Sequence, residues 1–136
     1  MIFNLKKKIY GFECDMYGHL NNAIYLQVFE TARAEALSSI GMSVTELLEK
    51  GYMLYLTKVE IKFKKGIELE DIINVQSKII EHNKMKFIWN QEIYNSKNEL
   101  CTEATVTGVY VSKATKSITR IDNELCDFFD KYVKEN

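Results

Sequence analysis

The spacing of apolar residues changes once along this chain, from steps of three and four to steps of two. Over residues 23–40 the longer steps dominate, which is typical of a helix with one buried face. The residues that set this spacing are Val28, Phe29, Ala32, Ala36, Leu37 and Ile40. Over residues 52–63 the step of two is typical of a half-buried strand. The pattern therefore predicts a long helix followed by strands.

The alternating positions of residues 52–63 divide this strand into an apolar face and a charged face. The expected apolar face carries Met53, Tyr55, Val59, Ile61 and Phe63, and the other carries Lys58, Glu60, Lys62 and Lys64. Three more strands are predicted over residues 72–80, 85–94 and 100–111, joined by turns at 81–84 and 95–98. Connections this short imply antiparallel neighbours. Strands at 4–12 and around 117–121 complete the expected set.

Local capping residues mark the ends of the predicted helices. Gly41 is the expected stop of the long helix. Ser43 and Glu46 form a capping box for a short second helix, which Gly51 closes. Asp122 is the expected cap of a last helix. The apolar stripe of that helix is Leu125, Phe128, Phe129, Tyr132 and Val133. The order of elements predicts one α+β domain, residues 1–136, whose antiparallel sheet packs on the long helix.

Composition narrows the class of protein. The chain has 136 residues, of which 46% are hydrophobic and 27% charged, as in ordinary globular proteins. Its net charge of -1 argues against a nucleic-acid-binding surface. No apolar run approaches the roughly 20 residues that cross a bilayer, and the first lysines follow the first apolar residues, the wrong order for a secretory signal. We therefore expect a cytoplasmic protein without nucleic-acid or membrane partners.

The cysteines and histidines form no recognisable metal-binding pattern. Cys14, Cys101 and Cys126 include no C-x-x-C pair, which argues against both a disulfide framework and a cysteine zinc site. No ligand spacing links His19 with His82. Cys14 is disfavoured as a nucleophile, because the carboxylate that follows it raises the pKa of a thiol. The sequence predicts reduced thiols and no bound metal.

Titratable residues crowd the stretch 14–22, where the chain enters its most apolar helix. Asp15 and His19 can exchange protons, and Asn21 or Asn22 is a natural N-cap. A helix N-terminus favours negative charge, so it can polarise a carbonyl or hold an oxyanion. These residues suit a functional site better than a core. The simplest alternative is that Asp15 only caps a turn, as aspartates often do.

The run D-x-x-G-H-x-N-N at residues 15–22 resembles the motif of the hotdog-fold acyl-CoA thioesterases of the 4-hydroxybenzoyl-CoA thioesterase-like family. The matching residues behind it are Tyr25, Phe29, Glu30, Ala32 and Arg33. The resemblance covers nearly the whole chain and implies an antiparallel sheet of about five strands curled around one long central helix. It also implies a homodimer or homotetramer with active sites at the dimer interface, and no cofactor beyond the coenzyme A of the substrate. The turn at 64–71 lacks the proline and the Gly-Asp pair that relatives often carry there.

The same resemblance implies roles for individual residues. Asp15 would act as general base or nucleophile, and the backbone N–H of Asn22 would polarise the thioester carbonyl. His19 would orient Asp15, donate to the thioester oxygen or close the turn. The further candidates for substrate binding in the motif are Gly18, Asn21 and Tyr25.

Charged residues beyond the motif each have two interpretations. Four lysines on and after the 52–63 strand either form a solvated face or hold the phosphates of coenzyme A. They are Lys58, Lys62, Lys64 and Lys65. Glu30 is either a catalytic carboxylate, as on the helix of a related hotdog group, or a local partner of Arg33.

The resemblance favours an acyl-CoA thioesterase, which hydrolyses an acyl-CoA thioester to a free acid and coenzyme A. One alternative is a non-catalytic acyl-CoA-binding hotdog domain, which would not need Asp15. Another is a thioesterase that acts on acyl carrier protein. A hydratase or dehydratase is disfavoured, because those relatives carry their histidine and acidic residue in other motifs. No G-x-S-x-G elbow supports a Ser-His-Asp triad.

Overall fold

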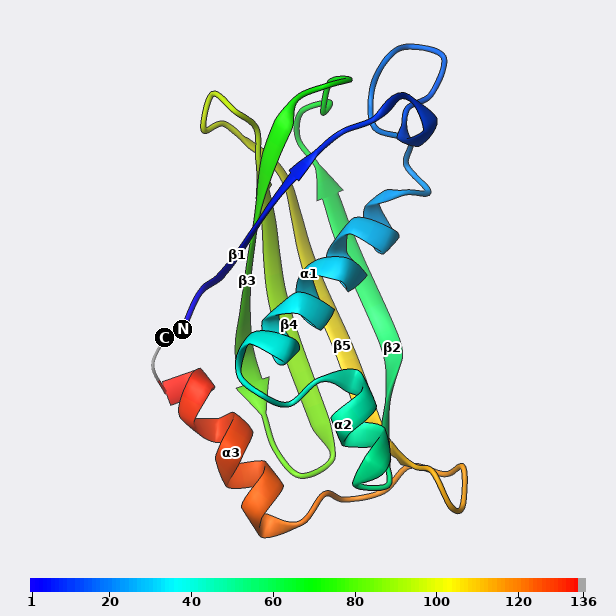
Figure 1. Cartoon of the computed structure of the whole chain (residues 1–136), viewed down its shortest axis with the longest axis vertical. Helices are drawn as coiled ribbons and strands as arrows, with labels where there is room; N and C mark the ends of the chain where they lie inside the picture. The colour runs from blue at the N-terminus through cyan, green and yellow to red at the C-terminus, as the bar shows by residue number, and fades with distance from the viewer. Residues whose placement is uncertain (135–136) are drawn as a thin grey trace.

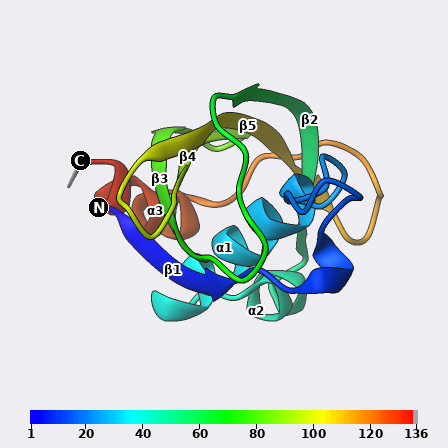
Figure 2. The ribbon, with the colours of Figure 1, turned by 90° about the horizontal axis from the view of Figure 1, so that it is seen from above.

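The computed structural model describes residues 1–134. In chain order its elements are β1 (Phe3–Lys8), the 3-10 turn η1 (Gly11–Glu13), α1 (Tyr25–Ser39), α2 (Val44–Glu49), β2 (Tyr52–Phe63), β3 (Ile72–His82), β4 (Lys86–Tyr94), β5 (Leu100–Ser112) and α3 (Asn123–Lys134). The strands form one antiparallel sheet in the order β1-β3-β4-β5-β2. The sheet curls around α1, which lies inside the curve in both views (Figure 1 and Figure 2). The predicted α+β architecture is confirmed.

The core lies between α1 and the concave face of the sheet. The buried residues of α1 are Tyr25, Val28, Phe29, Ala32, Ala36 and Leu37. On β4, Phe87, Trp89, Gln91 and Ile93 alternate with half-buried residues, as expected for a strand with one face on the core. In addition, α2 contacts β2 and α3 contacts β3. The long helix α1 is therefore central. The shorter helices α2 and α3 lie toward the end of the molecule that is opposite the N-terminal end of α1 (Figure 1).

The predicted face assignment of β2 is wrong in its first half. Register shifts between Leu56 and Lys58, where Thr57 is an extra residue. Such a bulge reverses which side of the sheet the following residues face. The inward row is therefore Leu54, Leu56, Val59, Ile61 and Phe63, opposite the buried positions Tyr110, Gly108, Val106, Ala104 and Thr102 of β5. Met53 and Tyr55 lie on the outer face, because they precede the bulge.

The predicted helix ends at Gly41, Ser43 and Asp122 are confirmed. Gly41 follows α1 with a φ of 76°, a left-handed conformation that glycine adopts without strain. Ser43 and Glu46 exchange both bonds of a capping box at the start of α2. Asp122 Oδ1 accepts a hydrogen bond of 2.8 Å from the backbone N–H of Leu125. Each of these helix ends depends on residues that are close together in the sequence.

Two predicted strands are shorter in the structure. The first becomes β1 and ends before η1, where Glu13 accepts a 3.0 Å hydrogen bond from the backbone N–H of Tyr10. The strand expected at 117–121 is reduced to one bridge between Val111 and Ile118. Since β5 already has β4 along one edge and β2 along the other, no free edge remains for a longer pairing. Among the helices of residues 1–134, none has the length and apolar character that crossing a bilayer requires.

Candidate functional site

Asp15 closes the loop that leads into α1. Its Oδ1 accepts hydrogen bonds from the backbone N–H groups of Tyr17, at 2.9 Å, and His19, at 3.3 Å. Gly18 has a φ of 77°, and this left-handed residue completes the tight turn. Within residues 1–134, Oδ2 accepts no hydrogen bond. One oxygen of Asp15 therefore holds the loop, and the other remains available for chemistry.

The start of α1 differs from the prediction. The helix begins at Tyr25, and its N-cap is Ile24, which makes no side-chain capping bond. Asn21 Oδ1 instead accepts a 3.0 Å hydrogen bond from the backbone N–H of Ala23, so it stabilises the turn before the helix. The prediction that Asn21 or Asn22 is the N-cap is wrong, because this extra turn shifts the helix by two residues. No acceptor in the described chain bonds the backbone N–H of Asn22, so this group can donate to a ligand.

The turn at 64–71 forms the floor of this loop. The backbone N–H of Leu20 donates to the Ile67 carbonyl at 2.7 Å. A Cβ on Gly66 would lie 3.2 Å from Cδ2 of His19, so the imidazole ring rests directly on the glycine. The hydrogen bond between His19 and Asp15 comes from the backbone of His19 and not from its ring. The turn at 64–71, which lacks the proline and the Gly-Asp pair of relatives, therefore positions His19.

Tyr25 and Cys14, which flank the loop, are poorly placed for chemistry. Tyr25 is 3% exposed, and its ring packs edge-on against Phe63 with the centroids 4.9 Å apart. Burial raises the pKa of the Cys14 thiol, and the carboxylate of Asp15 raises it further. A thiol with a raised pKa is a poor nucleophile at neutral pH.

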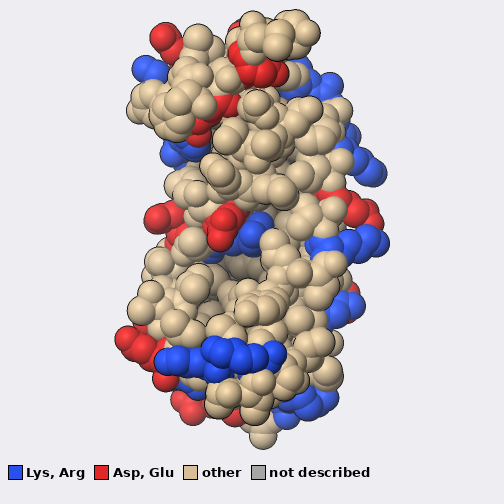
Figure 3. All heavy atoms as spheres, turned by 90° about the vertical axis from the view of Figure 1, so that its right-hand side faces the viewer, with Lys and Arg blue, Asp and Glu red and all other residues tan. Residues whose placement is uncertain are grey.

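A cavity of about 350 Å³ opens between α1 and β2. It begins beside Leu26 and Gln27 in the first turn of α1, and it extends to Leu37, close to the end of this helix. Eleven residues of helix span about 16 Å. The sheet side of this α1–β2 cavity consists of Leu54, Leu56, Val59, Phe87, Trp89 and Val106. Figure 3 shows a hollow on this side of the molecule, with acidic and basic atoms at its upper border.

Two charged residues line the α1–β2 cavity, Glu30 and Arg33. The predicted pair between them is wrong: within residues 1–134, no ion pair joins them. Arg33 instead donates from Nη1 to Oε1 of Gln91 at 2.9 Å. Gln91 is fully buried and donates from Nε2 to the Phe29 carbonyl, at 3.0 Å, and to Ser77 Oγ, at 2.9 Å. The sequence signal for this network was a glutamine in the apolar phase of β4.

Three of the four lysines proposed to hold phosphates form ion pairs with carboxylates, and Lys62 lies opposite Glu103 of β5. The ion pairs are Lys58 with Glu60 at 2.6 Å, Lys64 with Glu103 at 3.4 Å and Lys65 with Glu99 at 2.5 Å. Exposed pairs of this kind are worth less than about 1 kcal/mol, so they do not prevent a lysine from binding a phosphate.

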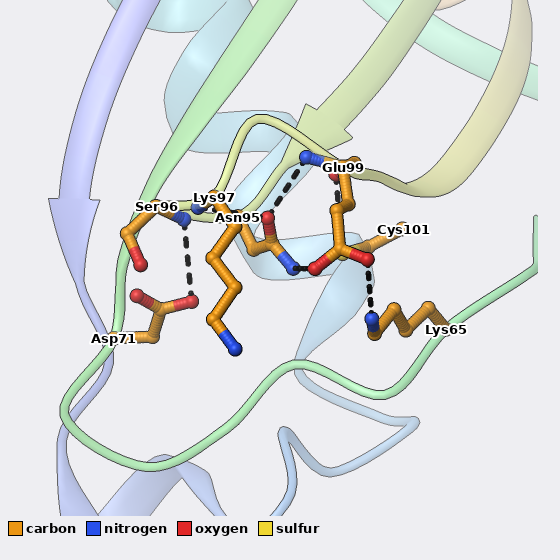
Figure 4. Close-up of polar contacts among 7 residues, drawn as sticks. All are labelled: Lys65, Asp71, Asn95, Ser96, Lys97, Glu99 and Cys101. Atoms are coloured by element: carbon orange, nitrogen blue, oxygen red, sulfur yellow. Dashed lines mark hydrogen bonds and ion pairs between the residues drawn. The ribbon is translucent and has the colours of Figure 1, made fainter.

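Lys65 also borders a polar hollow between the turn before β3 and the β4–β5 turn. Figure 4 shows Glu99 between Asn95, which donates to it at 3.1 Å, and Lys65, while the side chain of Lys97 extends between Asp71 and Lys65. The hydrogen bond from Lys65 lowers the pKa of Glu99. The charged residues that line the hollow are Lys65, Lys97, Glu68, Glu70, Asp71 and Glu99. Four carboxylates against two lysines make this hollow unfavourable for phosphate.

A second group of titratable residues joins β3 to α3. His82 lies with Nδ1 2.8 Å from Asp130 Oδ1 and with Nε2 2.6 Å from the hydroxyl of Tyr110. Cys126 Sγ donates to Asp130 Oδ2 at 3.7 Å. Burial lowers the pKa of His82 and raises that of Tyr110. The ligand atoms of His82, Cys126 and Asp130 lie within 4.8 Å of one another, but they already satisfy one another as a link between sheet and helix. Sequence spacing missed the group because 44 residues separate His82 from Cys126.

Comparison with known proteins agrees with this architecture. The chain is 24% identical over 128 residues to "Long-chain acyl-CoA thioesterase FadM" of Escherichia coli, covering 93% of this chain and 96% of that protein. The DHNA-CoA thioesterase of Staphylococcus aureus superposes with a TM-score of 0.89 at 22% identity, over 98% of this chain and 90% of that one. The S. aureus protein SAV2348, solved in complex with CoA, superposes with a TM-score of 0.90 at 16% identity, over 98% and 85%. These likenesses confirm the hotdog fold. Since the Thioesterase-like superfamily matches residues 12–129, which are most of the chain, the protein belongs to that superfamily.

Proposed function

We propose that this protein is an acyl-CoA thioesterase, which hydrolyses an acyl-CoA thioester to a free acid and coenzyme A. The observation that carries the proposal is the loop before α1, where the free Oδ2 of Asp15 and the free N–H of Asn22 lie seven residues apart. The names of two similar proteins, a long-chain acyl-CoA thioesterase and a DHNA-CoA thioesterase, support this activity. A third similar structure was solved with CoA.

In the proposed mechanism Asp15 supplies the carboxylate. Oδ1 is fixed by two backbone N–H groups, so Oδ2 has a defined direction from which to take a proton from water or attack the carbonyl carbon. As a general base, Asp15 lets the water oxygen add to the carbonyl carbon; as a nucleophile, it forms an anhydride that water then hydrolyses. In both cases the carbon–sulfur bond breaks, and the thiolate of coenzyme A takes up the proton that the water loses. The N–H of Asn22 stabilises the negative charge on the thioester oxygen, and one such donor is typically worth about 3 kcal/mol in the transition state. His19, fixed on Gly66, borders the same loop and is a further donor.

The α1–β2 cavity is the proposed acyl site. It starts at the first turn of α1, the end of the helix into which the Asp15 loop leads (Figure 1). Its wall is predominantly apolar, as is usual for a site that binds a hydrocarbon group. The acyl chain would extend along α1, with the thioester near Asp15 and coenzyme A outside.

We further propose that the protein is a homodimer or a dimer of dimers. Within residues 1–134, the β2 edge of the sheet has no strand partner on its outer side. Tyr55, Leu56 and Phe63 on this twelve-residue strand are about half exposed. A long edge strand with exposed apolar side chains offers a template for pairing with another chain. Light scattering at micromolar concentration should give a multiple of the 15.9 kDa chain mass, and a monomer mass would contradict the assembly.

The activity is tested by a thiol-release assay over a panel of acyl-CoA and acyl carrier protein thioesters. We expect hydrolysis of acyl-CoA at rates well above those of an Asp15→Ala variant. A protein that binds acyl-CoA but releases no thiol from any ester, with or without Asp15, would instead be a binding domain. Faster hydrolysis of carrier-protein esters than of the matched CoA esters would transfer the proposal to that substrate.

A further inference from the structure

Arg33 is an unusual residue for the wall of an acyl cavity. The α1–β2 cavity is lined mainly by apolar side chains, and Arg33 is the cation among its lining residues. Its side chain is partly buried, and burial lowers the pKa of its guanidinium. A desolvated charge is costly unless an opposite charge or several hydrogen bonds compensate for it.

The described chain provides little of this compensation. Arg33 makes one side-chain hydrogen bond, to the neutral amide oxygen of Gln91. Glu30 acts on it through space, but no carboxylate of residues 1–134 forms an ion pair with it. A guanidinium has five N–H donors in a planar fork that suits a carboxylate. Most of this donor capacity is unused.

The direction of the guanidinium is fixed rather than adaptable. Gln91 is fully buried, and its own amide is held by the Phe29 carbonyl and Ser77 Oγ. The Gln91 oxygen is therefore a rigid anchor for Nη1 of Arg33. A charged donor that is held in place at the wall of a cavity loses little entropy when it binds an oxygen of a ligand.

The position of Arg33 along α1 sets the depth of this donor. Eight residues separate it from the start of the helix at Tyr25, which is about 12 Å along the axis. An extended chain advances about 3.8 Å over three bonds, so roughly ten atoms reach from the first turn of α1 to this depth.

We propose that Arg33 is a specificity residue, which makes the α1–β2 cavity select medium-length acyl groups that carry a carboxylate or hydroxyl oxygen at the far end. This inference rests on the proposed thioesterase function and adds the class of acyl group. The apolar wall binds the methylene chain, and the guanidinium binds the terminal oxygen. A plain alkyl chain of the same length leaves the guanidinium without an acceptor.

The test compares three CoA esters of one chain length: decanoyl, 10-hydroxydecanoyl and the mono-CoA ester of decanedioic acid. We expect kcat/KM for the decanedioic ester to exceed that for decanoyl-CoA by about tenfold, the usual effect of one charge-assisted hydrogen bond. The hydroxy ester should lie between them. In Arg33→Met, which keeps an apolar stem without the charge, the ratio should fall to about one. Arg33→Lys should restore part of it.

Arg120→Met is the matched control, since Arg120 is exposed and is the only other arginine of the chain. It should keep the wild-type ratio. A wild-type ratio near one, or an Arg33→Met ratio equal to that of wild type, would overturn the proposal. A lower oligomer mass in Arg33→Met with no change in ratio would also overturn it, because Arg33 would then pair with an acid of a second subunit.

Equilibrium binding separates this inference from the proposed activity. The same esters are titrated into the Asp15→Asn variant, whose cavity is intact, and the ratio of Kd values is measured without turnover. A preference for the decanedioic ester in binding, with no hydrolysis by wild type, would refute only the thioesterase function. Hydrolysis without any such preference would refute only the selectivity.

Discussion

Replacing Asp15 by asparagine separates chemistry from folding at this site. Oδ1 of Asp15 accepts two backbone hydrogen bonds, at 2.9 and 3.3 Å, and the amide oxygen of asparagine can accept both. The loop should therefore keep its shape, while the position of Oδ2 loses its negative charge. We expect kcat to fall at least about 100-fold, which corresponds to about 2.7 kcal/mol of activation free energy. Binding of acyl-CoA should persist.

Asp15→Ala is the informative comparison. It removes the charge and also leaves the N–H groups of Tyr17 and His19 without their acceptor. We expect it to lose about 1 kcal/mol of stability, a fall of about 3–5 °C in Tm, whereas the asparagine variant should stay within about 2 °C of wild type. Single-turnover thiol release and calorimetry measure the two effects. Undiminished hydrolysis by Asp15→Asn would refute the assignment of Asp15, and Glu30 and His19 would then be tested in that order.

Four further substitutions test the packing and the charges. Gly108→Ala should destabilise the fold by about 1–3 kcal/mol in chemical denaturation, because the added Cβ would lie 2.2 Å from Cζ of Phe87 and 2.8 Å from the backbone oxygen of Tyr55. An unchanged midpoint would show that both the ring and strand β2 shift without cost. Burial lowers the pKa of His82 in the folded state, so the free energy of unfolding should be highest above the unfolded pKa of about 6.5 and should decrease as pH falls below it. His82→Gln should weaken this dependence of stability on pH below about 6.5. An equally steep dependence in the variant would contradict the assignment to His82. Lys64→Glu should raise KM for acyl-CoA several-fold, in a salt-sensitive way and with kcat nearly constant. Lys65→Glu, beside the acidic hollow, should change KM less than Lys64→Glu does. Equal effects of the two variants on KM would show that the carboxylates of the hollow do not disfavour phosphate binding at Lys65.

The sequence by itself determined the features that depend on neighbouring residues. Ser43 and Glu46 are three residues apart and satisfy each other's backbone groups, so their spacing was sufficient to place the start of α2. The limits of β2 were also readable, because alternation is a local property of a strand. The motif at residues 15–22 indicated the family, and the turn that Asp15 closes involves residues only two and four positions away.

Only the tertiary structure decided which distant groups meet. The bulge in β2 depends on its register with β5. It places Met53 and Tyr55 on the outer face of the sheet and not on the inner one, although the alternation of this strand was predicted correctly. Arg33 and Gln91 are 58 residues apart, and the local pairing rule favoured Glu30 as the partner of Arg33 instead. The exposed carboxylate of Glu30 is well hydrated and gains little from a surface pair, whereas the buried oxygen of Gln91 would be costly to leave without a donor. Hydrogen bonds of this kind depend on strand pairing and burial, which the spacing of neighbouring residues in the sequence does not reveal.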